Sequence, residues 1–353
     1  MSERDKTIDI ARGIGITLMV IGHTYCPQVL CDFIYLFHMP LFFFLSGYLS
    51  LKLFEINPNY TVLKHKLKKL YLPYVSFSFV LLVLHNTLFD FHLEPVRYST
   101  MNIIIKTVEL PLMMGTDSLI AGYWFLGSLF YIFMIAVVFN FFLNNIGRNT
   151  RIMIIAIMFF VLFEIIFYSR RLYPNMATGM DFISGWLITI QSGGVMFMIG
   201  CLFKAFNVSP YFSKRYVALG MILLLLMTYL QPIYRPYDDV SLGVFVFLAG
   251  VIGTLTTLSI SKYVTGIIAN ILSVFGEHTL LILSWHLIFF KLVPLPFVLF
   301  KLNSLNILSE YPVPYKLCAN GGWIAFCFVG ICTPLLCSYL YNRLKLSFTE
   351  RND

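Results

Sequence analysis

The feature that most constrains this chain is a series of long apolar segments, each about long enough to cross a lipid bilayer as a helix. The hydrocarbon core is about 30 Å thick and a helix rises about 1.5 Å per residue, so one span needs about 20 residues. Ten segments fit this requirement: 8–25, 32–54, 71–91, 122–144, 151–169, 182–204, 216–233, 239–260, 272–293 and 320–342. The sequence therefore predicts an all-α integral membrane protein with about ten transmembrane helices.

The composition excludes the main alternatives. Hydrophobic residues make up 59% of the 353 residues and charged residues 12%, whereas soluble domains carry about 25% charged residues. So few charges cannot cover a water-facing surface, which excludes a soluble globular protein, a disordered chain and a coiled coil. The apolar runs are also continuous, and do not alternate over about 10 residues as in an outer-membrane barrel.

We expect a single transmembrane domain over residues 1–353, with no appended soluble domain. The longest loops between the predicted spans, near 92–121 and 294–319, are too short to fold as a domain of their own. One segment of the first loop, 99–114, is too short and too polar to cross a bilayer. It is predicted to be an interfacial or re-entrant piece.

The basic residues fall mainly on one side of this topology. Ten spans place both termini on one side, and that side carries 17 of the 25 lysines and arginines. Cytoplasmic loops are enriched in these residues, so both termini are predicted to be cytoplasmic. The net charge of +8 then reflects membrane orientation and contact with lipid headgroups, and nucleic acid is not expected as a partner.

Ionisable residues inside predicted spans are expensive, so each is a candidate site residue. Arg12 and His23 are the most informative pair. Eleven residues correspond to three helical turns plus about 20°, so both side chains lie on one stripe, about 16 Å apart along the axis. Gly13 and its neighbours would let a helix or ligand approach this stripe closely. The others are His38, His85, Glu164, Glu277, His278 and His286.

Two interpretations of this pair remain open. In the functional one, Arg12 binds an anionic group near the cytoplasmic face and His23 acts deeper in the span as a general base, a task that suits imidazole. In the structural one, Arg12 reaches the lipid headgroups and His23 is hydrogen-bonded near the outer surface.

Two further sequence patterns also allow either a functional or a structural interpretation. His38 precedes Pro40, which is expected to kink its span and free backbone carbonyls for a ligand, or simply to shape the packing. Lys66 and Lys69 share one face of a predicted helix within a basic run. They are either a clamp for a phosphate-bearing ligand or a topology signal that contacts anionic headgroups.

The remaining ionisable residues give weaker signals. Glu277, His278 and His286 lie within the predicted span 272–293, and the two histidines are about 80° apart around a continuous helix, so both could border a cavity. Glu164 requires a basic partner or a proton, and His85 is expected to be structural. The seven cysteines show no metal-binding spacing, and no metal site is predicted from them. Cys26 and Cys31 share a short loop and could form a disulfide if that loop faces an oxidising compartment, but two free thiols are the favoured interpretation.

Five stretches together resemble the membrane-bound acyltransferase family 3, the O-acyltransferases of cell-surface sugars. They occur in the family's order and cover nearly the whole chain. The motifs are IDIARG at 8–13 followed by His23, FHMPLFFFLSGY at 37–48, LYLPY at 70–74, YWFL at 123–126, and FGEHTL at 275–280 followed by His286.

This resemblance implies an enzyme of the bacterial inner membrane with ten helices. It implies an O-acyltransferase, most often an O-acetyltransferase, that uses cytoplasmic acyl-CoA as co-substrate and a hydroxyl of a cell-surface or lipid-linked sugar as acceptor. No bound cofactor is expected. The soluble hydrolase-like domain of some relatives is absent from these 353 residues.

The resemblance also implies roles for particular residues. Arg12 would lie near the donor and His23 would be the essential base. Lys66 and Lys69 stand where the family often has an Arg-x-x-Arg pair, so the charge is kept but the bidentate phosphate geometry is lost. Candidate pocket residues are His38, Ser46, Trp124, Glu277, His278 and His286.

Two other classes of function are compatible with a chain of this composition. A transporter or exporter of a small anion or a lipid-linked saccharide should show an internal repeat with paired broken helices. The sequence has one prominent proline-interrupted span, at His38–Pro40, without a matching copy in the second half. A non-catalytic membrane scaffold would leave the Arg12–His23 stripe and the basic run as coincidences.

Overall fold

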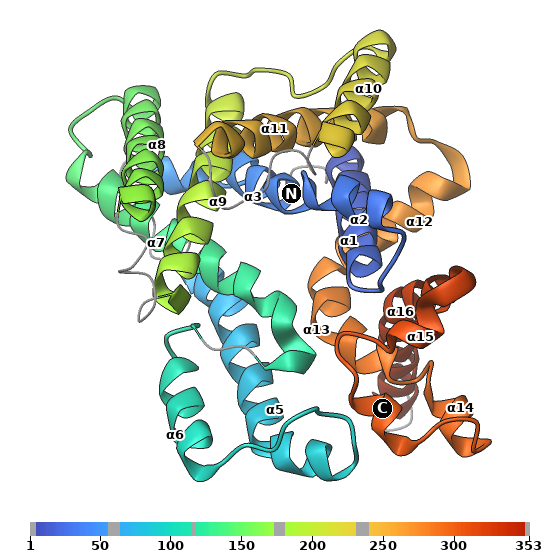
Figure 1. Cartoon of the computed structure of the whole chain (residues 1–353). Coiled ribbons are helices and arrows are strands. Elements are labelled where there is room, and N and C mark those ends of the chain that lie inside the picture. Colours follow the sequence, from blue (N-terminus) through green and yellow to red (C-terminus); the bar gives the residue numbers. More distant parts are fainter. Residues whose placement is uncertain (1–4, 56–63, 115–116, 173–180, 231–239, 350–353) are drawn as a thin grey trace. The chain divides into compact units, whose positions relative to one another are not determined.

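The computed structural model describes residues 5–55, 64–114, 117–172, 181–230 and 240–349. Every regular element among these residues is a helix (Figure 1). The chain divides into two compact units. The first comprises residues 1–31, 75–123 and 265–353, and the second comprises 32–74 and 124–264.

The first unit is built on the packing of α1 against α12. It contains α1 (Lys6–Gly22), α5 (Leu72–Asp90) from Val75 onward, α6 (Thr100–Glu109), η3 (Ser118–Tyr123), α12 (Gly266–Glu277), α13 (Thr279–Phe290), α14 (Leu295–Leu299), α15 (Tyr315–Cys318) and α16 (Trp323–Thr349). A Cβ atom on Gly13 of α1 would lie 1.9 Å from the carbonyl oxygen of Leu272, and one on Gly276 of α12 would lie 1.8 Å from that of Asp9. Glycines on both helices therefore let the two backbones touch.

The second unit repeats this device with other helices. It contains the end of α2 (Gln28–Tyr35), α3 (His38–Tyr48), η1 (Leu51–Phe54), η2 (Leu67–Tyr71), α7 (Trp124–Phe142), α8 (Arg148–Leu172), α9 (Asp181–Ala205), α10 (Lys214–Leu230) and α11 (Val240–Tyr263). A Cβ on Gly47 of α3 would lie 1.8 Å from the carbonyl oxygen of Phe197, and one on Gly200 of α9 would lie 2.1 Å from that of Phe44. Each unit thus has one reciprocal glycine crossing at its centre.

Several helices are long and apolar enough to cross a membrane, which fits a multi-pass membrane protein. Six such candidates lie among the described residues: Gln28–Tyr48, Lys64–Asp90, Ser118–Phe142, Val244–Tyr263, Thr279–Leu299 and Trp323–Lys345. The predicted count of about ten spans is therefore not confirmed. Two shorter apolar helices are Ser192–Ala205 and Gly266–Glu277. The predicted non-spanning segment 99–114 contains α6, which has 10 residues and is too short to cross.

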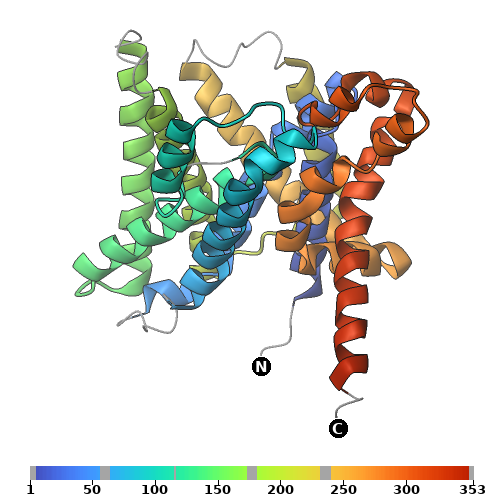
Figure 2. The same ribbon diagram turned by 90° about the horizontal axis from the view of Figure 1, so that it is seen from below.

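Two predicted spans are interrupted. The segment 32–54 breaks between α2 and α3, and Phe37 caps α3 with a non-helical φ of −147°. Pro40 therefore lies in the first turn of α3, where its missing N–H needs no partner, and the expected kink at Pro40 is instead a helix start. The segment 272–293 breaks at His278, which ends α12 and begins α13. By contrast, α16 is one helix despite Pro334 (Figure 2).

Candidate functional site

Arg12 and His23 both belong to α1, where the sequence predicts a helix. α1 is regular to Gly22, and His23 caps it, with its backbone N–H 3.2 Å from the carbonyl oxygen of Val20. The Arg12 side chain is 33% exposed, and its guanidinium lies 4.0 Å from the carboxylate of Asp9, one turn earlier. Asp9 is buried, so part of the Arg12 charge is balanced within the helix.

The ring of His23 contacts the ring of His286, which comes from α13. The ring centroids are 5.4 Å apart and the planes are tilted by 53°. The two residues are 263 positions apart in the sequence. The first unit therefore brings the predicted base and one of the candidate pocket residues into direct contact.

The hydrogen bonds of His286 define its tautomer. Its Nδ1 lies 3.1 Å from the carbonyl oxygen of Ile282 and 3.0 Å from that of Leu283. A carbonyl can only accept, so Nδ1 carries the proton and Nε2 carries the lone pair. The side chain is fully buried, and Nε2 has no hydrogen-bond partner among the described residues. A bound hydroxyl or water would satisfy this atom, since buried polar atoms are rarely left unpaired.

The short helix η3 packs against α13 next to His286. The phenol of Tyr123 in η3 lies 2.6 Å from the hydroxyl of Ser284, which itself donates to the carbonyl of Leu280 at 2.7 Å. Because Ser284 has one proton, Tyr123 must be the donor to Ser284. A Cβ on Gly122 would lie 3.9 Å from Cε1 of His286, so η3 approaches the histidine closely.

The other two candidates near α13 lie at its junction with α12. Glu277 is exposed. His278 caps the end of α12, and its Nδ1 is 2.9 Å from the carbonyl oxygen of Val274 in the same helix. The predicted angle of about 80° between His278 and His286 holds only for one continuous helix. The backbone breaks at His278, so the angle does not apply, and of these two histidines it is His286 whose ring contacts His23.

Lys66 and Lys69 belong to the second unit, and their environments differ. The ammonium of Lys66 lies 3.2 Å from the hydroxyl of Ser50 and 3.9 Å from the centre of the Phe133 ring. Lys69 is exposed, in the π-helical turn Leu67–Tyr71. The shared face assumed α-helical geometry, and the wider i→i+5 turn separates residues that an α-helix would align.

The remaining candidates of the second unit make local contacts. Nδ1 of His38 is 2.8 Å from the carbonyl oxygen of Ile34, across the break between α2 and α3. Ser46 donates to the carbonyl of Phe42 at 2.7 Å. Trp124 begins α7 and is 36% exposed. Glu164 lies on α8, and its side chain is outside the described part of the structure.

Sequence reasoning missed several residues that shape the site. Tyr123 and Ser284 form a buried hydroxyl pair, and the only sequence signal was the presence of Tyr123 in the YWFL motif. His85 was expected to be structural, and its acidic partner Asp117 was not singled out. Loop residues such as Asp117 reach a helix only through tertiary structure, so spacing along the chain does not reveal them.

Comparison with known proteins places this geometry in a family. A family model described as an acyltransferase domain matches residues 5–342. The chain belongs to the acyltransferase family 3. This range includes Arg12, His23 and His286, so the histidine pair lies within the matched family domain.

The chain is similar over a short stretch to a curated protein. The nodulation protein NolL of Mesorhizobium japonicum (strain LMG 29417 / CECT 9101 / MAFF 303099) is 42% identical over 60 residues. The match covers 14% of this chain and 16% of the relative, so it spans a small part of either protein. No solved structure matches this chain.

Proposed function

We propose that this protein is a membrane O-acyltransferase that moves an acyl group, most often acetyl, from cytoplasmic acyl-CoA to a hydroxyl of a cell-surface or lipid-linked sugar. The observation that carries the proposal is the His23–His286 contact inside an acyltransferase domain. The fully buried His286 offers an unpartnered lone pair among the described residues, next to a second imidazole. Such a pair is suited to removing a proton from an alcohol.

In the proposed reaction, His23 removes the proton of the acceptor hydroxyl while the hydroxyl oxygen attacks the thioester carbonyl carbon. The carbon–sulfur bond then breaks, the new ester forms, and the CoA sulfur leaves with the proton that His23 returns. His286 supports this cycle because its Nδ1 proton is held by two carbonyls, which fixes its ring beside His23. Two adjacent imidazoles disfavour a double positive charge, so one ring stays neutral and able to accept a proton.

Basic residues would bind the donor. Arg12, predicted to lie on the same helical stripe as His23, is assigned to the phosphates of CoA. Lys66 and Lys69 are also proposed as donor-binding residues, and the basic run that contains them supports this role. We further propose a bacterial inner-membrane location with ten crossings and cytoplasmic termini, which would expose these residues to cytoplasmic acyl-CoA.

The experiment that tests the function compares surface glycans from cells with the gene, without it, and with His23→Gln. Ester-linked acyl groups are released by mild base and quantified by mass spectrometry. We expect one class of ester to be lost without the gene and with His23→Gln, and to be restored by the wild-type gene. An unchanged ester content in cells without the gene would contradict an acyltransferase acting on surface sugars.

A further inference from the structure

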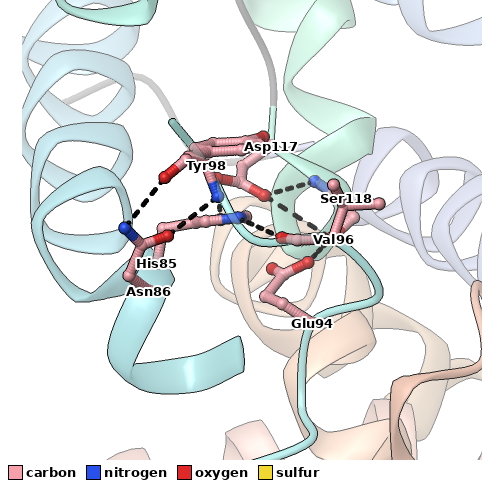
Figure 3. A network of polar contacts seen from close by, with 7 residues as sticks. All are labelled: His85, Asn86, Glu94, Val96, Tyr98, Asp117 and Ser118. Carbon is pink, nitrogen blue, oxygen red and sulfur yellow. Dashed lines mark hydrogen bonds and ion pairs between the residues drawn. The ribbon is translucent and has the colours of Figure 1, made fainter. Parts of the chain in front are cut away.

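A second polar cluster lies in the first unit, apart from the two histidines of the proposed site. His85 is near the end of α5, Glu94 is in the loop that follows, and Asp117 directly precedes η3. The three residues are buried, with exposures of 2%, 2% and 8%. One ligand atom of each lies within 4.8 Å of the other two (Figure 3).

The orientation of His85 is fixed from outside the cluster. Its Nε2 lies 2.8 Å from the carbonyl oxygen of Val96, so Nε2 carries a proton and donates it. Its Nδ1 then points at the carboxylate of Asp117, 2.9 Å away. Metal-binding histidines characteristically donate their second N–H to a carbonyl in this way. A lone pair on Nδ1 facing a carboxylate requires a cation between them, either a proton or a metal ion.

The carboxylates are also held in place by a residue that is not a ligand. The backbone N–H of Ser118 donates to Oδ1 of Asp117 at 2.7 Å, and its hydroxyl donates to Oε2 of Glu94. Ser118 therefore holds one oxygen of each carboxylate, and the other oxygen of Asp117, Oδ2, faces His85. The ring of Tyr98 stacks on that of His85, with centroids 3.4 Å apart, and closes one side of the cluster (Figure 3).

The charges of the cluster also call for a cation. Glu94 and Asp117 are both buried and their carboxylates lie close together, so two negative charges are costly here without a positive partner. Lys291 is the cation that faces Glu94 from the end of α13, and its ammonium donates to the carbonyl of Glu310 at 2.9 Å. A divalent ion at the centre would balance both carboxylates at once.

We propose that His85, Glu94 and Asp117 bind a divalent transition-metal ion, with Zn²⁺ as the best match. One imidazole nitrogen and two carboxylate oxygens are ligands that Zn²⁺ accepts, whereas Ca²⁺ takes six to eight oxygens and Mg²⁺ an octahedron of oxygens. Zinc–ligand distances of about 2.1 Å imply ligand separations of about 3.4 Å in a tetrahedron. One separation is 2.9 Å and all three ligand atoms lie within 4.8 Å of one another, so the ion would bring them to a common distance, and water would supply the fourth ligand.

Such an ion would join three separate pieces of chain. It would fasten the loop after α5 to the end of that helix and to the start of η3, which carries Gly122 and Tyr123 to α13. The metal would therefore be a structural support for one wall of the histidine site. Its binding does not depend on the proposed acyl transfer, so the two can be tested separately.

Zinc content measures the proposal directly. The full-length protein is purified in detergent, freed of its affinity tag, stripped with a chelator, given Zn²⁺, desalted and analysed by mass spectrometry. We expect about one zinc per chain for the wild type. The His85→Ala and Glu94→Gln proteins should retain little zinc. In Glu94→Gln the side-chain amide oxygen can still accept the hydrogen bond from Ser118, so the loss of zinc would report the loss of a ligand. Ser118→Ala should weaken the affinity by about 10–100-fold, as changes around metal ligands do.

The matched control is His92→Asn, which removes an imidazole from the same loop. His92 has a φ of 59°, which Asn tolerates. The His92→Asn protein should therefore retain the wild-type zinc content. In the wild type, the chelator should lower the melting temperature, and Zn²⁺ but not Mg²⁺ should restore it, which keeps the proposal testable if His85→Ala fails to fold. A wild type without retained zinc, or equal zinc in wild type and Glu94→Gln, would overturn the proposal.

Discussion

At the scale of single residues, the histidine pair shows what sequence and structure each contribute. The sequence predicts His23 as a candidate base from its spacing to Arg12, and it places His286 only among the pocket candidates. The contact between the two rings depends on α13 packing beside α1, across 263 positions. Periodicity reports which residues share a face of one helix, and it carries no information on which distant helix will meet that face.

The first prediction concerns the proposed base. His23→Gln should reduce acyl transfer by about 10²–10⁴-fold, because Gln keeps a hydrogen-bonding side chain but cannot take up a proton near neutral pH. The measurement is acyl transfer from labelled acetyl-CoA by purified protein, with acetyl-CoA binding as a separate readout that should stay near the wild-type value. A near-wild-type rate would exclude His23 as the base and make His286 the next residue to test.

The second prediction concerns donor binding by the lysines. Removing the charge in Lys66→Met and Lys69→Ala should raise the KM for acyl-CoA more than the KM for the acceptor, because phosphates would be the groups affected. Met retains the apolar stem that lies over Phe133. If neither variant changes the donor KM, the basic run serves orientation in the membrane only.

The third prediction is a pH dependence at Glu94 in metal-free protein. The pKa of Glu94 is raised from 4.5 to about 7 in the folded state, mainly by burial. The folded state then binds more protons than the unfolded state between these values, so stability should fall as the pH rises from about 4.5 to about 7. In Glu94→Gln, the melting temperature should change less with pH across this window. An unaltered pH dependence would show that other groups produce it.

At the scale of elements, hydropathy located the helices but not their breaks. Each of the ten predicted segments overlaps a helix of the structure. The apolar residues continue through Phe37 and His278, where the backbone leaves the helix, so an average over a window of residues cannot register either break. The close helix contacts were partly predictable, because Gly13 was singled out as a point of close approach and α12 touches it there.

The fourth prediction concerns that contact. Gly13→Ala would place a Cβ 1.9 Å from the carbonyl oxygen of Leu272, so α1 and α12 would have to separate. Overpacking of this kind costs about 1–3 kcal/mol or more. We expect a lower melting temperature and a smaller folded yield in detergent. Gly147→Ala is the control, since a Cβ there meets nothing within 4 Å. Equal stability of both variants would contradict the backbone contact.

At the scale of the whole molecule, the predicted single domain and the two compact units describe different properties. The family match covers residues 5–342 without interruption. The units are nevertheless discontinuous in sequence, because residues 124–264 of the second unit separate two parts of the first. Composition could identify a membrane protein, but it could not show this division, which depends on contacts between distant segments.

The fifth prediction tests the orientation of the chain. The excess of basic residues predicts that both termini and the 55–70 segment face the cytoplasm. Reporter enzymes that are active only in the cytoplasm should therefore be active when fused after Asp353 or inserted within 55–70. Activity of a reporter that requires the outer compartment, at either place, would contradict the ten-span topology.

The discontinuity of the first unit also sets an order of events at the ribosome. His23 emerges early, but the helix that carries His286 is translated 263 residues later. At about 5–20 residues per second, the growing chain would wait about 10–50 s before the two rings could meet. During that interval, α1 lacks both α12 and α13 and must be held by lipid, by the insertion machinery or by earlier helices. The histidine site is therefore among the last parts of the protein to be assembled, and a chain truncated before α13 would lack it.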